Sequence, residues 1–289
     1  MFYQSYLPST RFRDLVARYM IVIDDGKHTG WQKMDVVPNG LPGLGFSYGE
    51  NFHYFAGCEP SKEISSANVV GIHSSPYTTT WKNPMRLFVI VFRPLGLYQL
   101  LKQDMGALKN DLTSFNLLGL TESEAICERL SVLPAHEDKI AFMETWMAGK
   151  LSGKDVKTTL TGHITDLILE RKGMVSISSL ATELHVNKKY IERHFNEQLG
   201  LTPKEYADII RFSYLNTLML RESISCSELT YLGDFYDQSH LIKHFQRMTG
   251  LTPKAFKENA KLSPEALFLR KHNIFELISR TPGFIVQEY

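Results

Sequence analysis

The sequence predicts a multidomain α+β protein, in which a strand-rich N-terminal domain is followed by an all-α C-terminal domain. Up to about residue 95, aromatic and β-branched residues cluster in short runs between turn signals such as Asp25-Gly26 and Pro42-Gly43, which is typical of strands. Beyond Gly96, apolar residues recur at the spacing of helices. A small, polar segment at 149–154 contains two glycines and separates the two parts, so we place the domain boundary there.

These patterns divide the chain into three parts. The N-terminal domain takes residues 1–152, with strands to about residue 95 and helices over about 96–150. The helical domain takes residues 157–260, and residues 261–289 continue as a helical extension. A chain of 289 residues is long enough for two separate cores.

The composition limits the kinds of protein that the chain can be. Its formal net charge of +1 means that any contact with nucleic acid requires a local basic surface. The three cysteines are far apart and form no Cys-x-x-Cys pair, which argues against a zinc site or a disulfide framework. The N-terminus lacks the pattern of a secretory signal, and the longest apolar run, at 87–92, is far shorter than the roughly 20 residues that span a bilayer. By elimination we expect a cytoplasmic protein with no membrane contact.

The most informative feature is an internal repeat in the helical domain. The run Gly-Leu-Thr-Pro-Lys occurs at 200–204 and again 50 residues later at 250–254. His194-Phe195 recurs as His244-Phe245 at the same offset. Identical residues in phase over this distance are hard to obtain by chance, so we infer two copies of one structural unit.

Each copy has the layout of a helix-turn-helix. In the first copy we expect Ser178 to cap one helix and Asn187 to cap the next, and in the second copy Ser227 and Asp237 take these roles. The two units then cover about 178–199 and about 227–249, joined by a linker helix over about 203–221. Such a linker is roughly 28 Å long at about 1.5 Å per residue, which is close to the separation of about 34 Å between successive major-groove segments.

The second helix of each unit presents an outward face of polar and basic residues that suits a major groove. Arginine and lysine pair with guanine, glutamine pairs with adenine, glutamate accepts from cytosine, and an apolar side chain meets the thymine methyl. An ordinary solvated helix face is the alternative, but two such faces within one repeat favour DNA binding. The candidate DNA-binding residues are Lys188, Lys189, Glu192, Arg193, Asn196, Gln238, Ser239, Ile242, Lys243 and Gln246.

Residues 157–260 resemble the DNA-binding domain of the AraC/XylS family of bacterial transcription regulators. The resemblance is carried by the segments at 177–184, 190–195, 236–241 and 249–253, together with Phe245. It implies two helix-turn-helix subdomains that read two adjacent major-groove segments. One departure lies before the second reading helix, where the family has a glycine and an aromatic residue but this chain has Asp234-Phe235, with Gly233 one place early. Aspartate tolerates a left-handed turn better than most residues, so we expect the turn to form.

The N-terminal part is similar to an uncharacterised cupin-like domain found in some of these regulators. The similarity rests on the segments at 36–40, 87–92 and 93–97 and covers about residues 1–110. It implies a β half-barrel followed by helices. Aromatic residues inside such a barrel could line a pocket for a small-molecule effector or could form a plain core, which is the simpler interpretation. They are Trp31, Phe46, Tyr54, Phe55, Tyr77 and Trp81.

Nothing in the sequence favours an enzyme. A metal-binding cupin needs a His-x-His pair, whereas His53 and His73 each stand alone, and there is no P-loop, dinucleotide fingerprint or nucleophile elbow. We therefore expect no catalytic residues, metal or cofactor. Two alternatives stay open: a cupin-type enzyme or a thiol-based repair protein, using Cys58 for example, with an appended DNA-binding module, and an architectural DNA binder.

The expected partners follow from the regulator interpretation. They are double-stranded DNA and a small-molecule effector, with RNA polymerase and a second copy of the chain as further candidates.

Overall fold

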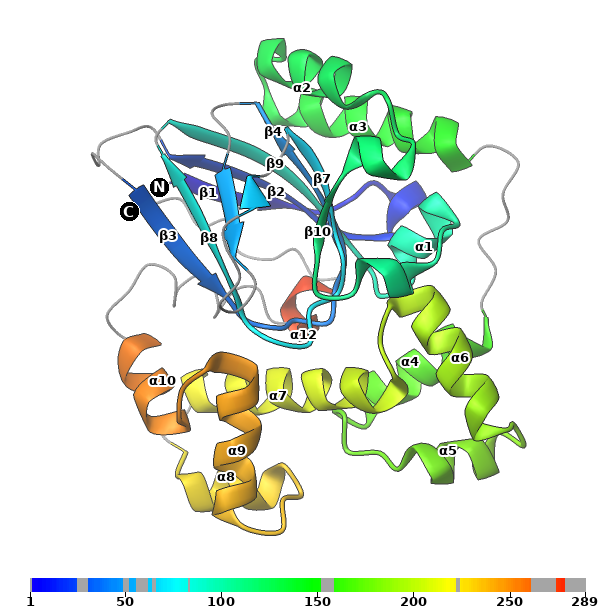
Figure 1. The fold of residues 1–289 in the computed structure, drawn as a ribbon, viewed down its shortest axis with the longest axis vertical. Helices are drawn as coiled ribbons and strands as arrows, with labels where there is room; N and C mark the ends of the chain where they lie inside the picture. Colours follow the sequence, from blue (N-terminus) through cyan, green and yellow to red (C-terminus); the bar gives the residue numbers. More distant parts are fainter. Residues whose placement is uncertain are drawn as a thin grey trace.

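The computed structural model describes most of the chain. The described residues are 2–24, 31–48, 52–55, 62–63, 66–82, 84–151, 159–221, 224–260 and 274–278. Within them, the strands lie in the first part of the chain and the C-terminal part is entirely helical, with the linker helix running below the strand-rich domain (Figure 1). The expected fold class is confirmed at this level: a strand-rich domain with helices, followed by a helical region with helix-turn-helix units.

The N-terminal domain contains two antiparallel sheets. The first has six strands in the order β1-β2-β9-β4-β7-β10, and the second has four in the order β3-β8-β5-β6. The bounds in the first sheet are β1 (Phe2–Tyr6), β2 (Val16–Asp24), β9 (Met85–Phe92), β4 (Gly43–Ser47), β7 (Ala67–Val70) and β10 (Leu112–Ser114). In the second sheet they are β3 (Trp31–Val36), β8 (Tyr77–Lys82), β5 (Phe52–Phe55) and β6 (Lys62–Glu63).

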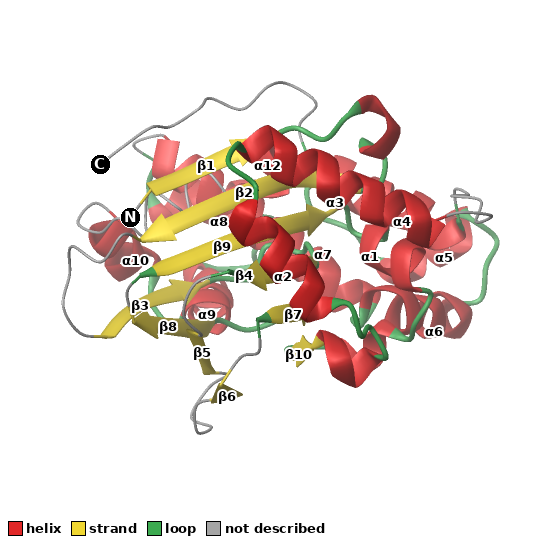
Figure 2. Cartoon of the chain, turned by 90° about the horizontal axis from the view of Figure 1, so that it is seen from above, coloured by secondary structure: helices red, strands yellow, loops and turns green. Residues whose placement is uncertain are grey.

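Helices cover one face of the six-stranded sheet. The longest are α2 (Ser123–Val132) and α3 (His136–Leu151), which lie over the sheet in both views (Figures 1 and 2). Shorter elements complete this side: α1 (Gly96–Leu101) and the 3₁₀ helices η1 (Thr10–Phe12), η2 (Met105–Leu108) and η3 (Phe115–Leu118). Fully buried side chains such as Phe46, Phe88 and Met143 fill the space between sheet and helices. Because strand residues alternate between faces, the other face of the sheet is left for the four-stranded sheet.

The C-terminal domain is built around one long helix, α7 (Pro203–Arg221), with the bounds that the sequence predicts. The first unit at one end of it consists of α5 (Ile177–Glu183) and α6 (Lys188–Leu199), preceded by α4 (Leu160–Glu170). The second unit at the other end consists of α8 (Cys226–Leu232) and α9 (Gln238–Thr249), followed by α10 (Pro253–Ala260) (Figure 1). Tyr206, Ile209 and Ile210 are completely buried, which fixes α7 in the core.

Two of the four expected helix caps are corrected by the structure. The cap of α5 is Ser176, whose side chain accepts from the Ser179 amide, and not Ser178. The cap of α8 is Ser225, which forms a complete capping box with Glu228, and not Ser227. A Ser-x-x-Glu pair satisfies two otherwise unpaired backbone donors at once, so the helix begins two residues earlier than expected.

The caps of the reading helices are as expected. Asn187 accepts from the Lys189 amide at the start of α6, and Asp237 accepts from the His240 amide at the start of α9. Gly200 and Gly250 end these helices with φ of 75° in both cases, a left-handed conformation that suits glycine.

The two domains are in direct contact. Lys109, just after η2, pairs with Glu205 on α7 at 2.6 Å, and the hydroxyl of Tyr98 donates to Glu197 on α6 at 3.4 Å. At the end of α6 the approach is close, because a Cβ on Gly200 would lie 2.5 Å from the carbonyl oxygen of Met105. The first helix-turn-helix unit is therefore seated on the N-terminal domain.

Part of the C-terminal extension is packed into this junction. Helix α12 (Ile274–Leu277) lies between the sheet domain and α7 (Figure 1). Ile274 is completely buried, and the Arg93 guanidinium donates to the Ile278 carbonyl at 3.0 Å. The other residues of the expected extension, 261–273 and 279–289, lie outside the described residues.

The tight contact between Gly71 and η2 gives a first prediction. A Cβ at Gly71 would lie only 1.7 Å from the carbonyl oxygen of Leu108, so Gly71→Ala is expected to lower the free energy of unfolding by about 2–3 kcal/mol through overpacking. Gly149→Ala is the control, because a Cβ on this exposed helical glycine meets nothing within 4 Å, and it is expected to gain up to about 1 kcal/mol. Urea unfolding of the three proteins measures both changes. Equal stability of Gly71→Ala and the parent would show that η2 is not fixed as described.

Candidate nucleic-acid interface and cavity

The first reading helix, α6, is presented by a short turn after α5. His185 takes a left-handed φ of 54° in this turn, Asn187 caps the helix, and Ile191 and Phe195 anchor its inner face in the core. The predicted DNA-binding residues of this helix lie on its outer side, where Glu192 is half-buried and the others are exposed. They are Lys188, Lys189, Glu192, Arg193 and Asn196.

The second reading helix, α9, is presented in the same way. Asp234 takes the left-handed conformation with a φ of 53°, as expected for this position. Leu241 and Phe245 anchor the inner face, and the amide of Gln238 donates to the Ser227 hydroxyl at 2.8 Å. The predicted DNA-binding residues are exposed, apart from the half-buried Ile242. They are Gln238, Ser239, Ile242, Lys243 and Gln246.

Arg211 of α7 holds the second turn in place. Its Nε donates to the carbonyl of Gly233 at 2.5 Å and its Nη2 donates to the carbonyl of Asp234 at 2.6 Å. The guanidinium also lies 4.1 Å from the ring centroid of Phe235, a cation–π contact. Burial lowers the pKa of Arg211, but the nearby Asp208 and Asp234 carboxylates oppose this shift. The linker helix therefore helps to set the orientation of α9 through these contacts.

The second turn is one residue longer than the first. Between the left-handed residue and the cap stands Val186 alone in the first unit, and Phe235 and Tyr236 in the second. Phe235 is buried, whereas Tyr236 is 95% exposed. Tyr231 and Tyr190 are also exposed, and the Tyr190 ring lies 5.5 Å from the Arg193 guanidinium. None of these tyrosines is among the candidate DNA-binding residues from the sequence, although a large aromatic residue in a polar turn, such as Tyr236, is a visible signal.

Asn196 differs from the other predicted DNA-binding residues in its surroundings. A Cβ on Gly106 of η2 would lie 2.8 Å from the Asn196 Nδ2. The N-terminal domain therefore borders the C-terminal half of α6, while Lys188, Lys189 and Arg193 lie towards its capped end.

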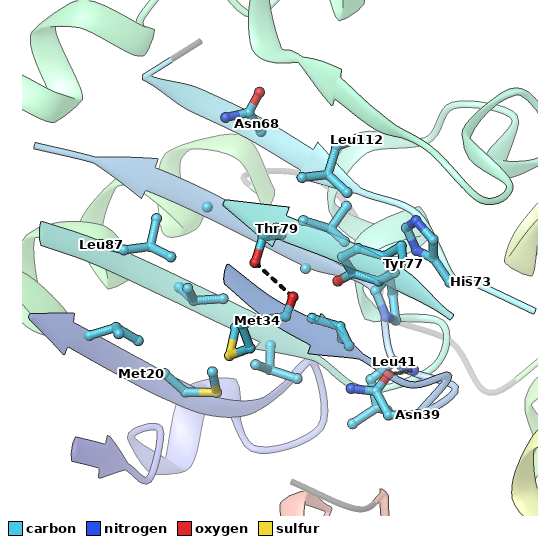
Figure 3. Close-up of a pocket in the computed structure, with 18 of the residues that line it drawn as sticks. Met20, Met34, Asn39, Leu41, Asn68, His73, Tyr77, Thr79, Leu87 and Leu112 are labelled. Atoms are coloured by element: carbon cyan, nitrogen blue, oxygen red, sulfur yellow. Dashed lines mark hydrogen bonds between the residues drawn. The ribbon is translucent and has the colours of Figure 1, made fainter. Parts of the chain in front are cut away.

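A cavity of about 160 Å³ lies between the two sheets of the N-terminal domain (Figure 3). Strands of both sheets supply its walls, with Met20 and Val22 on β2, Leu87 and Val89 on β9, and Met34 on β3. Two aromatic residues that the sequence analysis proposed, Tyr77 and Trp81, line it.

Two others of the proposed aromatic residues do not line the cavity. Gly43 and Gly45 of β4 face it, so by strand alternation Phe46 faces α3 and packs against Phe115 and Trp146. Trp31 is 54% exposed at the start of β3. The side chains of Tyr54 and Phe55 lie outside the described part of the chain.

The polar groups at the cavity are neutral. His73 Nδ1 is 2.9 Å from the Gly71 carbonyl oxygen, and burial lowers the His73 pKa to about 4, so the ring is uncharged near neutral pH. Its centroid lies 4.1 Å from that of Tyr77. Thr79 donates to the Met34 carbonyl at 3.4 Å across the β3–β8 pair (Figure 3).

Within the described residues, no three histidine, cysteine, aspartate or glutamate side chains are grouped as metal ligands would be. Burial raises the pKa of the Cys127 thiol to about 11, while Cys58 lies outside the described residues. No described helix has both the length and the apolar character needed to cross a membrane.

Two helix-turn-helix units on one linker helix define a DNA-binding domain. Residues 180–259 match the family described as a helix-turn-helix domain, and residues 4–114 match a domain of unknown function, DUF6597. The C-terminal region is therefore a helix-turn-helix domain of the AraC type, as the resemblance implied. No curated protein matches the sequence.

Several solved structures are similar at low identity. ToxT from Vibrio cholerae bound to (E)-4-(8-methylnaphthalen-1-yl)but-3-enoic acid is 13% identical, with a TM-score of 0.47 over 82% of this chain and 98% of that chain. Wild-type ToxT from Vibrio cholerae with a bound unsaturated fatty acid is 13% identical, with a TM-score of 0.45 over 83% and 94%. The C-terminal domain of the response regulator yesN from Fusobacterium nucleatum is 22% identical, with a TM-score of 0.31 over 32% and 93%.

The Arg211 contacts give a second prediction. Arg211→Lys removes the planar fork that reaches two carbonyls and is expected to lower the free energy of unfolding by about 1.5–3 kcal/mol and to weaken DNA binding. Arg171→Lys is the control, because the contact of the Arg171 side chain within the described residues is an exposed pair with Glu183, and the unfolding midpoint of this variant is expected not to move. Denaturant unfolding and DNA titration measure the two effects. If Arg211→Lys matches the parent in both measurements, Arg211 does not hold the second turn in place.

Buried histidines give a third prediction, on pH. Burial against the Phe235 ring lowers the His244 pKa to about 4, whereas an unfolded histidine has a pKa of about 6.5. Between these values the unfolded chain binds more protons, so stability falls as the pH falls from about 6.5 to about 4, by at most about 1.4 kcal/mol per pH unit for this residue.

The variant His244→Gln tests this pH dependence. This variant is expected to be less stable than the parent near pH 7. Its free energy of unfolding is expected to fall less steeply than that of the parent as the pH is lowered, and the buried His73 accounts for the pH dependence that remains. Unfolding at a series of pH values gives both slopes. Identical slopes would mean that His244 is not held neutral by burial.

Proposed function

We propose that this chain is a sequence-specific transcription regulator, in which α6 and α9 read two adjacent major-groove segments and a small molecule in the N-terminal cavity controls the binding. The observation that carries the proposal is the pair of capped helices fixed to opposite ends of α7 (Figure 1). The linker of 19 residues is roughly 28 Å long, against about 34 Å between successive groove segments.

The chemistry of the exposed faces supports this function. Each reading helix begins with free backbone amides near its cap, which suit a phosphate, and continues with donors that suit base edges. On α6, Lys189 and Arg193 are exposed donors for guanine. On α9, Gln238 is an exposed partner for adenine, and Ile242 suits a thymine methyl.

A loop that is shared between the cavity and the linker helix supports control by a small molecule. Asn39, Leu41 and Pro42 line the cavity. Between them, Gly40 has a φ of 76°, and a Cβ there would lie 3.4 Å from side-chain atoms of Tyr206 and Ile210 on α7 and of Ile274. A ligand in the cavity that moves this loop would change how α7 packs against the N-terminal domain. The positions of both reading helices would change with it.

In this proposal the regulator binds genomic DNA in the cytoplasm and acts through RNA polymerase. A second copy of the chain is a candidate partner, with which it would form a homodimer. A DNA selection from random duplexes with the full-length protein, at a stated salt concentration, tests the function. Enrichment of a motif that spans two groove segments about one turn apart supports the proposal. Salt-sensitive binding with no enriched motif would indicate an architectural binder.

The reading helices give a fourth prediction. Arg193→Ala and Gln238→Ala are each expected to lose about 1–3 kcal/mol of discrimination at the base pair that the side chain contacts, with the two changes falling at different ends of the motif. Arg129→Ala is the charge-matched control for Arg193→Ala, because it removes an exposed arginine of α2 that is far from both reading helices in the sequence. Its DNA specificity is expected to be unchanged. Competition titrations with single-base variants of the selected site measure the changes, and unaltered specificity in both variants would refute the assignment of these helices.

A further inference from the structure

We propose that the cavity between the two sheets takes an uncharged, largely apolar molecule with the dimensions of a single substituted ring, and that it selects against carboxylates. The inference rests on the proposed control by a small molecule and specifies its chemical class. It is drawn from the size of the cavity, the side chains that line it, and one buried carboxylate next to it.

The size of the cavity limits its occupant. Its volume is about 160 Å³, and an engineered apolar cavity of about 150 Å³ in another protein stays dry and binds benzene. The walls are mostly methionine, valine and leucine, with Trp81 as the large aromatic surface. An apolar ring therefore fits, and the site offers little else to hold a strongly hydrated group.

The lining carries no charge among the described residues. Its polar side chains are two asparagines, one histidine, one tyrosine and one threonine. The histidine, His73, is buried with its pKa lowered to about 4, so it supplies no positive charge near neutral pH. A carboxylate that entered would lose its hydration without gaining a cationic partner, which is costly.

A buried carboxylate beside the cavity adds to this selectivity. Asp24 is on the face of β2 that carries Met20 and Val22, and it is almost completely buried. One of its oxygens accepts from the Trp81 indole at 3.0 Å, and the other has no hydrogen-bond partner among the described residues. Its negative charge repels an anion and favours a hydrogen-bond donor.

The buried cation on the same strand face does not reverse this argument. Arg18 is also on this face of β2, but beyond Met20, and it is not among the residues that line the cavity. Burial lowers its pKa, which the hydroxyl of Tyr3 opposes.

Three of the five polar side chains of the lining lie towards one end of the cavity, whereas Thr79 and Asn68 lie away from that end (Figure 3). Figure 3 shows His73, Tyr77 and Asn39 near one end of the sheets, and Met20 and Leu87 near the other. The ligand is therefore an apolar body with one neutral polar group, such as an amide, a carbonyl or a hydroxyl.

Benzamide and benzoate provide the test, because they have nearly the same shape and differ in charge. Binding of each to the full-length protein is measured by calorimetry or ligand-observed NMR near neutral pH. Benzamide is expected to bind at least about tenfold more tightly. Equal binding, tighter binding of benzoate, or no binding of either probe overturns the proposal.

Three variants test whether the preference arises in this cavity. Met34→Lys adds an ammonium group to a half-buried lining position and is expected to shift the preference towards benzoate by about tenfold. Trp31→Lys adds the same charge at an exposed position of the same strand and is expected to leave the preference unchanged. Asp24→Asn keeps an acceptor for Trp81 and is expected to narrow the difference between the probes. If Met34→Lys and Asp24→Asn both keep the parent preference, the probes bind elsewhere and the proposal fails.

DNA binding of the same samples is measured separately, by fluorescence anisotropy with the selected duplex. If the protein binds its DNA site but does not prefer benzamide, the proposed ligand class is wrong and the proposed function stands. If the protein prefers benzamide but binds no specific DNA, the proposed function is wrong and the proposed ligand class stands.

Discussion

The close packing around α7 is the constraint on which the rest of the C-terminal domain depends. At Gly173 the turn before α5 approaches so closely that a Cβ would lie 2.2 Å from the Ala207 carbonyl oxygen. On the other unit, Arg211 holds the second turn, and Asp208 accepts from Arg247 of α9 at 2.9 Å. Both helical units are therefore packed directly against α7, and this packing sets the distance between them.

The sequence predicted local features well because they depend on neighbouring residues. The repeat, the bounds of α7, the caps Asn187 and Asp237 and the left-handed Asp234 all follow from short patterns. The caps of α5 and α8 were misplaced by two residues, because several serines stand close together there and the choice depends on which one finds a partner three residues on.

The cavity was harder to predict because it depends on which face of a sheet is covered. Phe46 and Tyr77 are both aromatic strand residues, yet one packs under α3 and the other lines the cavity. Alternation along a strand separates its two faces but does not say which face meets helices and which meets the second sheet. The docking of α6 on η2, through Gly106 and Gly200, is likewise a contact between distant segments. No local pattern marks it.

The additional residue in the second turn, Tyr236, has a consequence for the protein as a reader of DNA. Both units have a capped second helix, a left-handed turn and a closing Gly-Leu-Thr-Pro segment. Their turns differ in length, however, and among the described residues it is the first unit that contacts η2. The two heads are therefore not interchangeable. We therefore expect a single chain to distinguish its site from the reverse complement of that site and to lie on the duplex with a defined polarity.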